Sequence, residues 1–146
     1  MSLKKEIKRE VLFLKNKRLL YLILPLAILI LEILPYGAVC NFANSEGEPI
    51  RMIYSYFSLT PFGYANFAPF LTALASCVLL VLLLGFCFAK KKTLLQTARV
   101  TNAIAFALSV CPLLLGVRYY SAIGALITGA LGVQLILLLF AKKNAR

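Results

Sequence analysis

Glu32 is the residue of this chain whose type and position could most readily support chemistry. It lies inside an apolar run from about Leu19 to Tyr36. A carboxyl group within a membrane-spanning helix is costly to bury, so it normally faces a partner, a cavity or an ion. Glu32 lies about 13 residues from the predicted cytoplasmic end of its run. Because every α-helix rises by about 1.5 Å per residue, residues at the same count on other helices lie at the same depth. The same count on three later apolar runs reaches hydroxyl side chains, those of Ser76, Ser109 and Thr128.

The sequence allows three roles for Glu32. The carboxyl group could be neutral and structural, accepting hydrogen bonds from the three hydroxyls. It could pair with Arg118 or Arg51, whose long side chains could dip inward from the outer connections. It could instead bind a proton or a cation during transport. A second polar pair, Asn102 and Gln134, falls at similar depth in the inner third and predicts an interhelical hydrogen bond.

The residues that the chain lacks exclude several classes of enzyme. There is no His, no Asp and no Trp, so a Ser-His-Asp triad, an HExxH zinc site and bis-His haem ligation within this chain are ruled out. No two of its four cysteines form a CxxC pair, which gives a thiol oxidoreductase no support. We therefore expect a chain that is not an enzyme and has neither a cofactor nor a metal site. The cysteines are Cys40, Cys77, Cys87 and Cys111.

The elements that would position these side chains are apolar helices. Hydrophobic residues make up 62% of the chain, and its apolar runs are of the length that crosses a bilayer as a helix. The spacing predicts an all-α integral membrane protein, a single domain over residues 1–146, with one outer loop at 37–66. The predicted spans are 19–36, 67–89, 94–117 and 121–141. Asn66 is the expected N-cap of the second span, with Pro69 in its first turn, and Ser121 is the expected N-cap of the fourth.

Basic residues flank these runs unevenly. Of the 16 Lys and Arg residues, all except Arg51 and Arg118 fall in the clusters 4–18, 90–99 and 142–146. Because basic residues accumulate on the cytoplasmic side, both termini and the 90–99 loop are predicted to lie in the cytoplasm. The expected membrane is the plasma (inner) membrane. The net charge of +11 is then explained by topology and by contact with anionic lipids of the inner leaflet, and nucleic acid is not an expected partner.

Two segments outside the spans have their own patterns. Apolar residues recur at helical spacing within residues 1–18, which predicts a basic amphipathic helix on the inner leaflet. The outer loop is rich in Tyr and Phe, which favour the membrane boundary, so we expect it to lie against the top of the bundle. Pro49 could open a short helix inside the loop, although the apolar spacing also fits a strand.

The fourth predicted span has small residues spaced by four along two stripes. Such spacing lets helix backbones approach closely within a membrane. Packing inside the bundle is the ordinary explanation, and self-association into a homo-oligomer is the alternative. The stripes are Ser121, Ala125 and Gly129, and Gly124, Thr128 and Gly132.

The context of Glu32 resembles one known family over six residues. The run Ala27-Ile28-Leu29-Ile30-Leu31-Glu32 is similar to the first helix of small multidrug-resistance transporters, four-span dimers that use a single Glu there. The chain departs from that family in its long outer loop, its basic N-terminal extension and its lack of Trp. The order of a long and then a short outer loop also resembles the layout of claudin-like proteins, whose loop Trp and paired cysteines are missing. No family is assigned.

These features favour a non-catalytic four-span membrane protein, a subunit or accessory component that contacts another membrane protein. A small transporter or lipid-handling protein that uses Glu32 for proton or cation coupling is the alternative.

Overall fold

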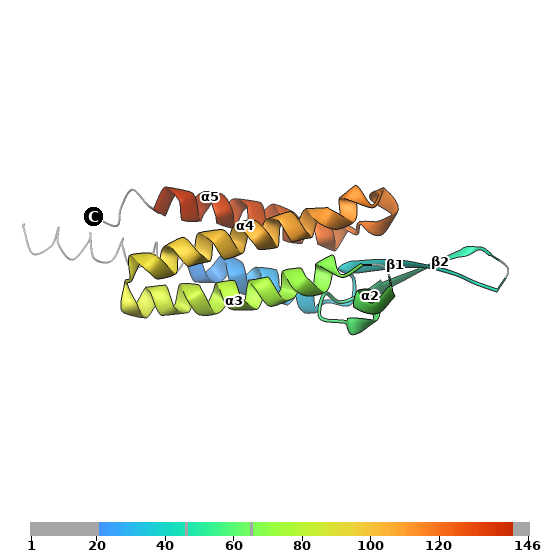
Figure 1. Cartoon of the computed structure of the whole chain (residues 1–146), viewed down its shortest axis with the longest axis horizontal. Helices are drawn as coiled ribbons and strands as arrows, with labels where there is room; N and C mark the ends of the chain where they lie inside the picture. The colour runs from blue at the N-terminus through green and yellow to red at the C-terminus, as the bar shows by residue number, and fades with distance from the viewer. Residues whose placement is uncertain (1–20, 46, 65, 142–146) are drawn as a thin grey trace, which may run out of the picture.

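The computed structural model describes residues 21–45, 47–64 and 66–141. The described chain is mostly helical, and one β-hairpin interrupts it (Figure 1). Helix Tyr21–Ile33 comes first, followed by β1 (Ala38–Ala43), β2 (Pro49–Tyr54), α2 (Leu59–Tyr64), α3 (Ala68–Ala89), α4 (Lys92–Leu114), the 3₁₀ turn η1 (Val117–Tyr119) and α5 (Ala122–Phe140). The amphipathic helix predicted at residues 1–18 and the basic cluster at 142–146 lie outside the described residues.

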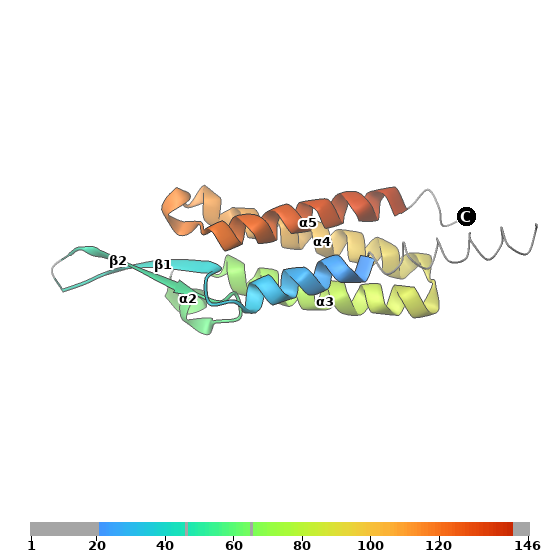
Figure 2. The same ribbon diagram turned by 180° about the vertical axis from the view of Figure 1, so that it is seen from behind.

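The helix Tyr21–Ile33 and helices α3, α4 and α5 run alongside one another in a bundle (Figures 1 and 2). One buried cluster takes a residue from each of the four, among them Ile28, Ala73, Ala105 and Ile127. A second buried cluster, which includes Leu79, Leu95 and Leu138, continues the core toward the turn between α3 and α4.

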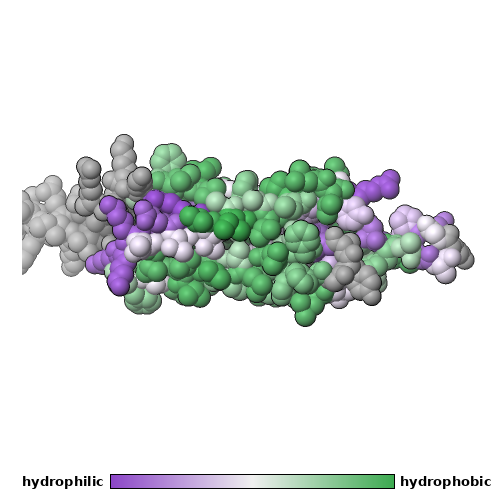
Figure 3. Space-filling model, viewed as in Figure 1, coloured by the Kyte–Doolittle hydropathy of each residue, from purple (hydrophilic) through white to green (hydrophobic). Residues whose placement is uncertain are grey.

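Helices α3, α4 and α5 are each long and apolar enough to cross a membrane. Many of their apolar side chains face outward, and green surface covers most of the face of the bundle seen in Figure 3. Val81 and Leu114, for example, are 67% and 82% exposed. Helix Tyr21–Ile33 is shorter, and its described part ends before Tyr36. Pro35 explains this end, because the residue before a proline disfavours the helical conformation.

The predicted span boundaries hold within three residues for the three long helices. The predicted N-cap at Ser121 is confirmed, since its hydroxyl accepts a hydrogen bond from the Gly124 amide at 2.8 Å. The predicted N-cap at Asn66 is wrong: α3 is capped by Phe67 without a side-chain bond, although Pro69 does lie in the first turn. The 90–99 loop is also shorter than predicted, because α4 already begins at Lys92.

The outer loop contains a β-hairpin where a short helix was the first expectation for Pro49. Strands β1 and β2 pair antiparallel, with Asn41 opposite Arg51 and Phe42 opposite Ile50. Gly47, at a positive φ of 82°, supports the turn with a bond from its amide to the Asn44 carbonyl. The strand alternative is therefore correct, because cross-strand pairing satisfies backbone groups that an isolated helical turn would leave open.

The predicted position of the loop against the bundle holds for its base and not for its tip. Tyr56 is 2% exposed, and Tyr54 and Phe57 are partly buried against the core. The hairpin itself extends beyond the ends of the helices (Figures 1 and 2). The loop therefore combines a packed base with a projecting two-stranded arm.

Candidate functional site

Glu32 occupies the last turn of the helix Tyr21–Ile33 and is completely buried. Its Oε1 atom accepts a hydrogen bond of 2.7 Å from the hydroxyl of Ser76 on α3. Ser76 is itself only 1% exposed, so the pair is a polar contact inside the bundle. The structure thus brings together Glu32 and one of the three hydroxyls that the sequence placed at its depth.

The second carboxyl oxygen of Glu32 has a different environment. Oε2 is buried and has no hydrogen-bond partner among the described residues. A buried polar atom without a partner costs free energy, so such atoms are rare in folded proteins. Protonation of this oxygen would remove the charge and turn the acceptor into a donor. A purely structural role for Glu32 does not explain why this oxygen is buried without a hydrogen bond.

Ser109 and Thr128 belong to a separate hydroxyl network, which corrects the prediction of a single polar layer. Ser109 donates to the Phe106 carbonyl at 2.7 Å. Thr128 donates to the carbonyl of Gly124 and, between helices, to that of Ser109 at 3.3 Å. The Tyr120 hydroxyl donates to the Thr128 hydroxyl at 2.6 Å. The hydroxyls of Ser109 and Thr128 therefore donate hydrogen bonds to nearby backbone carbonyls and not to Glu32, although the sequence placed them at its depth.

The alternative in which Glu32 pairs with Arg118 or Arg51 is also wrong. Arg51 lies on β2 and donates to the Tyr120 carbonyl at 3.5 Å, while Arg118 lies exposed in η1. Both arginines line an open cleft at the base of the hairpin and make no ion pair with Glu32. Glu32 is buried inside the bundle, whereas both arginine side chains are exposed near the base of the hairpin.

The inner polar pair forms no mutual hydrogen bond. The Asn102 amide nitrogen donates to the Leu131 carbonyl at 3.2 Å, and that of Gln134 donates to the Tyr21 carbonyl at 3.3 Å. Their amide oxygens have no partner within the described chain. Each side chain therefore joins its helix to a neighbour through the backbone, which corrects the expected pair while retaining the interhelical role.

Tyr56 is one of the loop aromatics expected to pack on the bundle, and it also lies beside Glu32, a contact that the sequence did not predict. Its backbone amide donates to the Glu32 carbonyl at 2.9 Å, and its ring packs against the Gly37 backbone. Burial raises the pKa of the Tyr56 phenol, and nearby Tyr120 and Glu32 raise it further, so the phenol stays neutral. The sequence offered one signal, an aromatic-rich loop that also contains Gly37. It could not show that Tyr56 packs on Gly37 and lies beside Glu32, because these residues are far apart in the chain.

The small-residue stripes on α5 divide between two environments. Gly124 and Gly132 lie against the bundle, near the Tyr56 hydroxyl and the Phe106 ring respectively. Ala125 and Gly129 are exposed, and an added Cβ at Gly129 would meet no atom within 4 Å. The stripe of Gly124, Thr128 and Gly132 packs internally. In the other stripe, Ser121 is buried and donates to the Gly37 carbonyl, while Ala125 and Gly129 face outward.

Comparisons with protein-family models, with curated proteins and with solved structures give no match to this chain.

Proposed function

We propose that this chain is a non-catalytic, four-span component of a membrane assembly, and that its hairpin is the element that contacts a partner protein. In this proposal both termini lie in the cytoplasm and the hairpin lies outside. The uneven distribution of basic residues supports that orientation. The predicted span 19–36, of which the structure describes the helix Tyr21–Ile33, would be the fourth span, in the plasma (inner) membrane.

The observation that carries the proposal is the exposure of strand β2. Every residue from Pro49 to Ile53 is exposed, and Ile50, Met52 and Ile53 are each more than 40% exposed. In the described chain the sheet has two strands, so β2 has no neighbour on its outer edge. Open edges and apolar strand faces are used to pair with an extended segment of another chain. A membrane protein that supplies such a segment is the proposed partner.

Photo-crosslinking tests this proposal directly. A photo-reactive amino acid at Met52, which is 47% exposed, is expected to give one discrete protein adduct in intact native membranes. The matched control is Val81, a similarly apolar and exposed position on α3, where lipid adducts should dominate. Mass spectrometry identifies the adduct, and Met52→Asp should reduce co-purification of that protein at least about fivefold. An adduct with a second copy would identify the assembly as a homo-oligomer. Equal adduct patterns at both positions would contradict the proposal.

Topology is tested separately by cysteine labelling. In a chain whose four native cysteines are replaced, Glu48→Cys should react with a membrane-impermeant maleimide in intact cells, because the hairpin lies outside. Lys91→Cys should react only after permeabilisation, because the turn between α3 and α4 lies inside. Both positions are exposed in the structure, so access from one side of the membrane is what the comparison measures. Labelling of Lys91→Cys in intact cells would overturn the orientation.

The unpartnered Oε2 atom of Glu32 favours a second candidate function. A buried carboxyl group with one oxygen uncommitted can exchange a proton or receive a cation, as a coupling site requires. Small transporters that use one intramembrane Glu follow this logic. In this alternative, Ser76 would orient the carboxyl group through its 2.7 Å hydrogen bond.

A further inference from the structure

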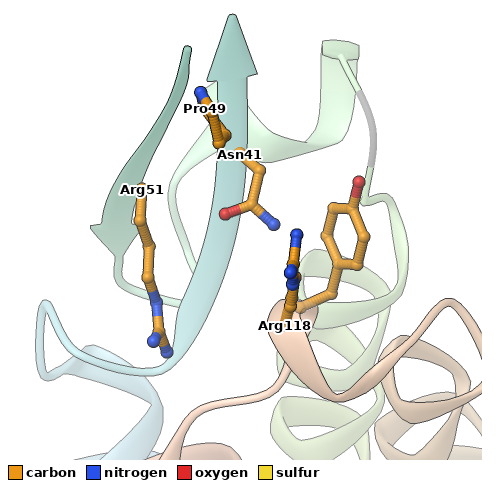
Figure 4. Close-up of a pocket in the computed structure, with 5 residues that line it drawn as sticks. Asn41, Pro49, Arg51 and Arg118 are labelled. Carbon is orange, nitrogen blue, oxygen red and sulfur yellow. The ribbon is translucent and has the colours of Figure 1, made fainter.

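An open cleft of about 440 Å³ lies where the hairpin meets the turn between α4 and α5. Its lining residues come from β1, β2 and η1 (Figure 4). They are Asn41, Pro49, Arg51, Arg118 and Tyr119.

The pairing of the two strands explains why these side chains meet. Asn41 and Arg51 are directly opposite each other, so they lie on the same face of the sheet, and Pro49 is the next residue of β2 on that face. The contact between β1 and η1 brings Arg118 and Tyr119 to this face. The cleft is thus assembled from segments almost 70 residues apart in the chain.

The cleft concentrates positive charge. Arg51 and Arg118 are the two basic residues of the outer connections, and both of them line it. Among the described residues neither has an acidic partner, and Glu48, beside Pro49, is exposed and pairs with neither. Arg51 makes one long hydrogen bond, to the Tyr120 carbonyl at 3.5 Å. Most N–H donors of the two guanidinium groups are therefore available to a ligand.

The position of the cleft narrows the ligand class. Turn η1 begins three residues after α4 ends at Leu114, so Arg118 lies just beyond the apolar part of the bundle. This is the depth of lipid headgroups when the long helices cross a bilayer. A phosphate group offers several oxygens around a tetrahedral centre and can accept from two guanidinium groups and an amide on different sides. A carboxylate has two oxygens in one plane and suits a single arginine better.

We propose that this cleft binds an anionic phosphate group, held between Arg51 and Arg118 with Asn41 as a neutral donor. The phosphate could belong to the headgroup of an anionic phospholipid or to a soluble phosphate. The chemistry of recognition is the same for these two sources, and the site does not depend on the partner proposed for β2.

A single-tryptophan reporter tests the site in the purified full chain. Because the chain has no Trp, Tyr119→Trp places one fluorophore in the cleft. The matched reporter is Phe88→Trp, 85% exposed beside the basic turn at Lys90 and Lys91, where charge is present without the arginine pair. In a non-ionic detergent at constant ionic strength, each reporter is titrated with inorganic phosphate, dihexanoyl-phosphatidylglycerol and dihexanoyl-phosphatidylcholine.

The Tyr119→Trp chain should give a saturable response to at least one anionic probe and none to phosphatidylcholine. Combining Arg51→Gln with Arg118→Gln should weaken binding at least about tenfold, the loss expected from one charge-assisted hydrogen bond. Arg51→Lys with Arg118→Lys should bind with intermediate affinity, because charge is kept and the planar fork is lost. Lys90→Gln with Lys91→Gln should change nothing at this reporter. Arg51, Arg118, Lys90 and Lys91 are all exposed, so their variants should fold like the wild type.

The two anionic probes distinguish the two sources of the phosphate group. Saturation by inorganic phosphate identifies a soluble phosphate site, and saturation by phosphatidylglycerol alone identifies a headgroup site. Phosphorus-31 line broadening on the chain with Tyr119 intact repeats the comparison between the wild type and the double Gln variant. The proposal is overturned by no saturable binding in either measurement, by equal responses at the two reporters, or by binding that survives loss of both arginines.

Discussion

Glu32→Leu is expected to destabilise the bundle by about 1–3 kcal/mol, the cost of leaving a buried polar group without its partner. In the wild type the buried Ser76 hydroxyl donates to Oε1 of Glu32 at 2.7 Å. Leucine fills similar space but has no acceptor, so the Ser76 hydroxyl loses this hydrogen bond. Glu32→Gln retains an acceptor oxygen for Ser76 and should be tolerated. Unfolding in mixed detergent micelles, followed by circular dichroism, measures the free energy of unfolding of the wild type and of both variants.

A double-mutant cycle shows whether the lost hydrogen bond is the cause. In a Ser76→Ala chain the hydroxyl is already absent, so Glu32→Leu should cost clearly less there than in the wild type. A Glu32→Leu chain as stable as the wild type would contradict the structural role. Proton uptake by dye-loaded vesicles containing the chain gives the complementary readout. Uptake that is abolished in a stably folded Glu32→Gln chain would establish the coupling role instead.

Gly37→Ala is the second substitution with a large expected effect, a loss of about 1–3 kcal/mol through overpacking. A Cβ atom at Gly37 would lie 2.7 Å from Cδ1 and 2.8 Å from Cε1 of the Tyr56 ring. The ring is 2% exposed and its backbone amide is bonded to the Glu32 carbonyl, so it has little room to move. The carbonyl of Gly37 is also bonded to Ser121 at 2.6 Å, which holds the glycine from the other side.

The same substitution at Gly129 is the matched control. No atom lies within 4 Å of the added methyl group there, and Ala is favoured over Gly inside a helix by up to about 1 kcal/mol. Gly129→Ala should therefore be neutral or slightly stabilising in the same micelle assay. If Gly37→Ala were as stable as Gly129→Ala, the close packing of the Tyr56 ring against Gly37 would be refuted.

Local patterns were sufficient for the long helices. The apolar runs, the cap at Ser121 and the proline in the first turn of α3 depend on neighbours within one helical turn, so their boundaries could be predicted within three residues. The depth count also placed Ser76 level with Glu32, because the rise per residue is the same in every helix. That count carries no information on which way a side chain points around its helix.

The sequence by itself determined that apolar helices dominate this chain and that one acid is buried among them. Tertiary structure decided the partners of Glu32, since rotation of each helix turned Ser109 and Thr128 toward backbone carbonyls and Ser76 toward the carboxyl group. It also decided the hairpin and the cleft, because strand pairing and the contact of β1 with η1 join segments that share no local pattern. Hydropathy depends on composition along the chain, whereas such contacts depend on distances between residues far apart in sequence.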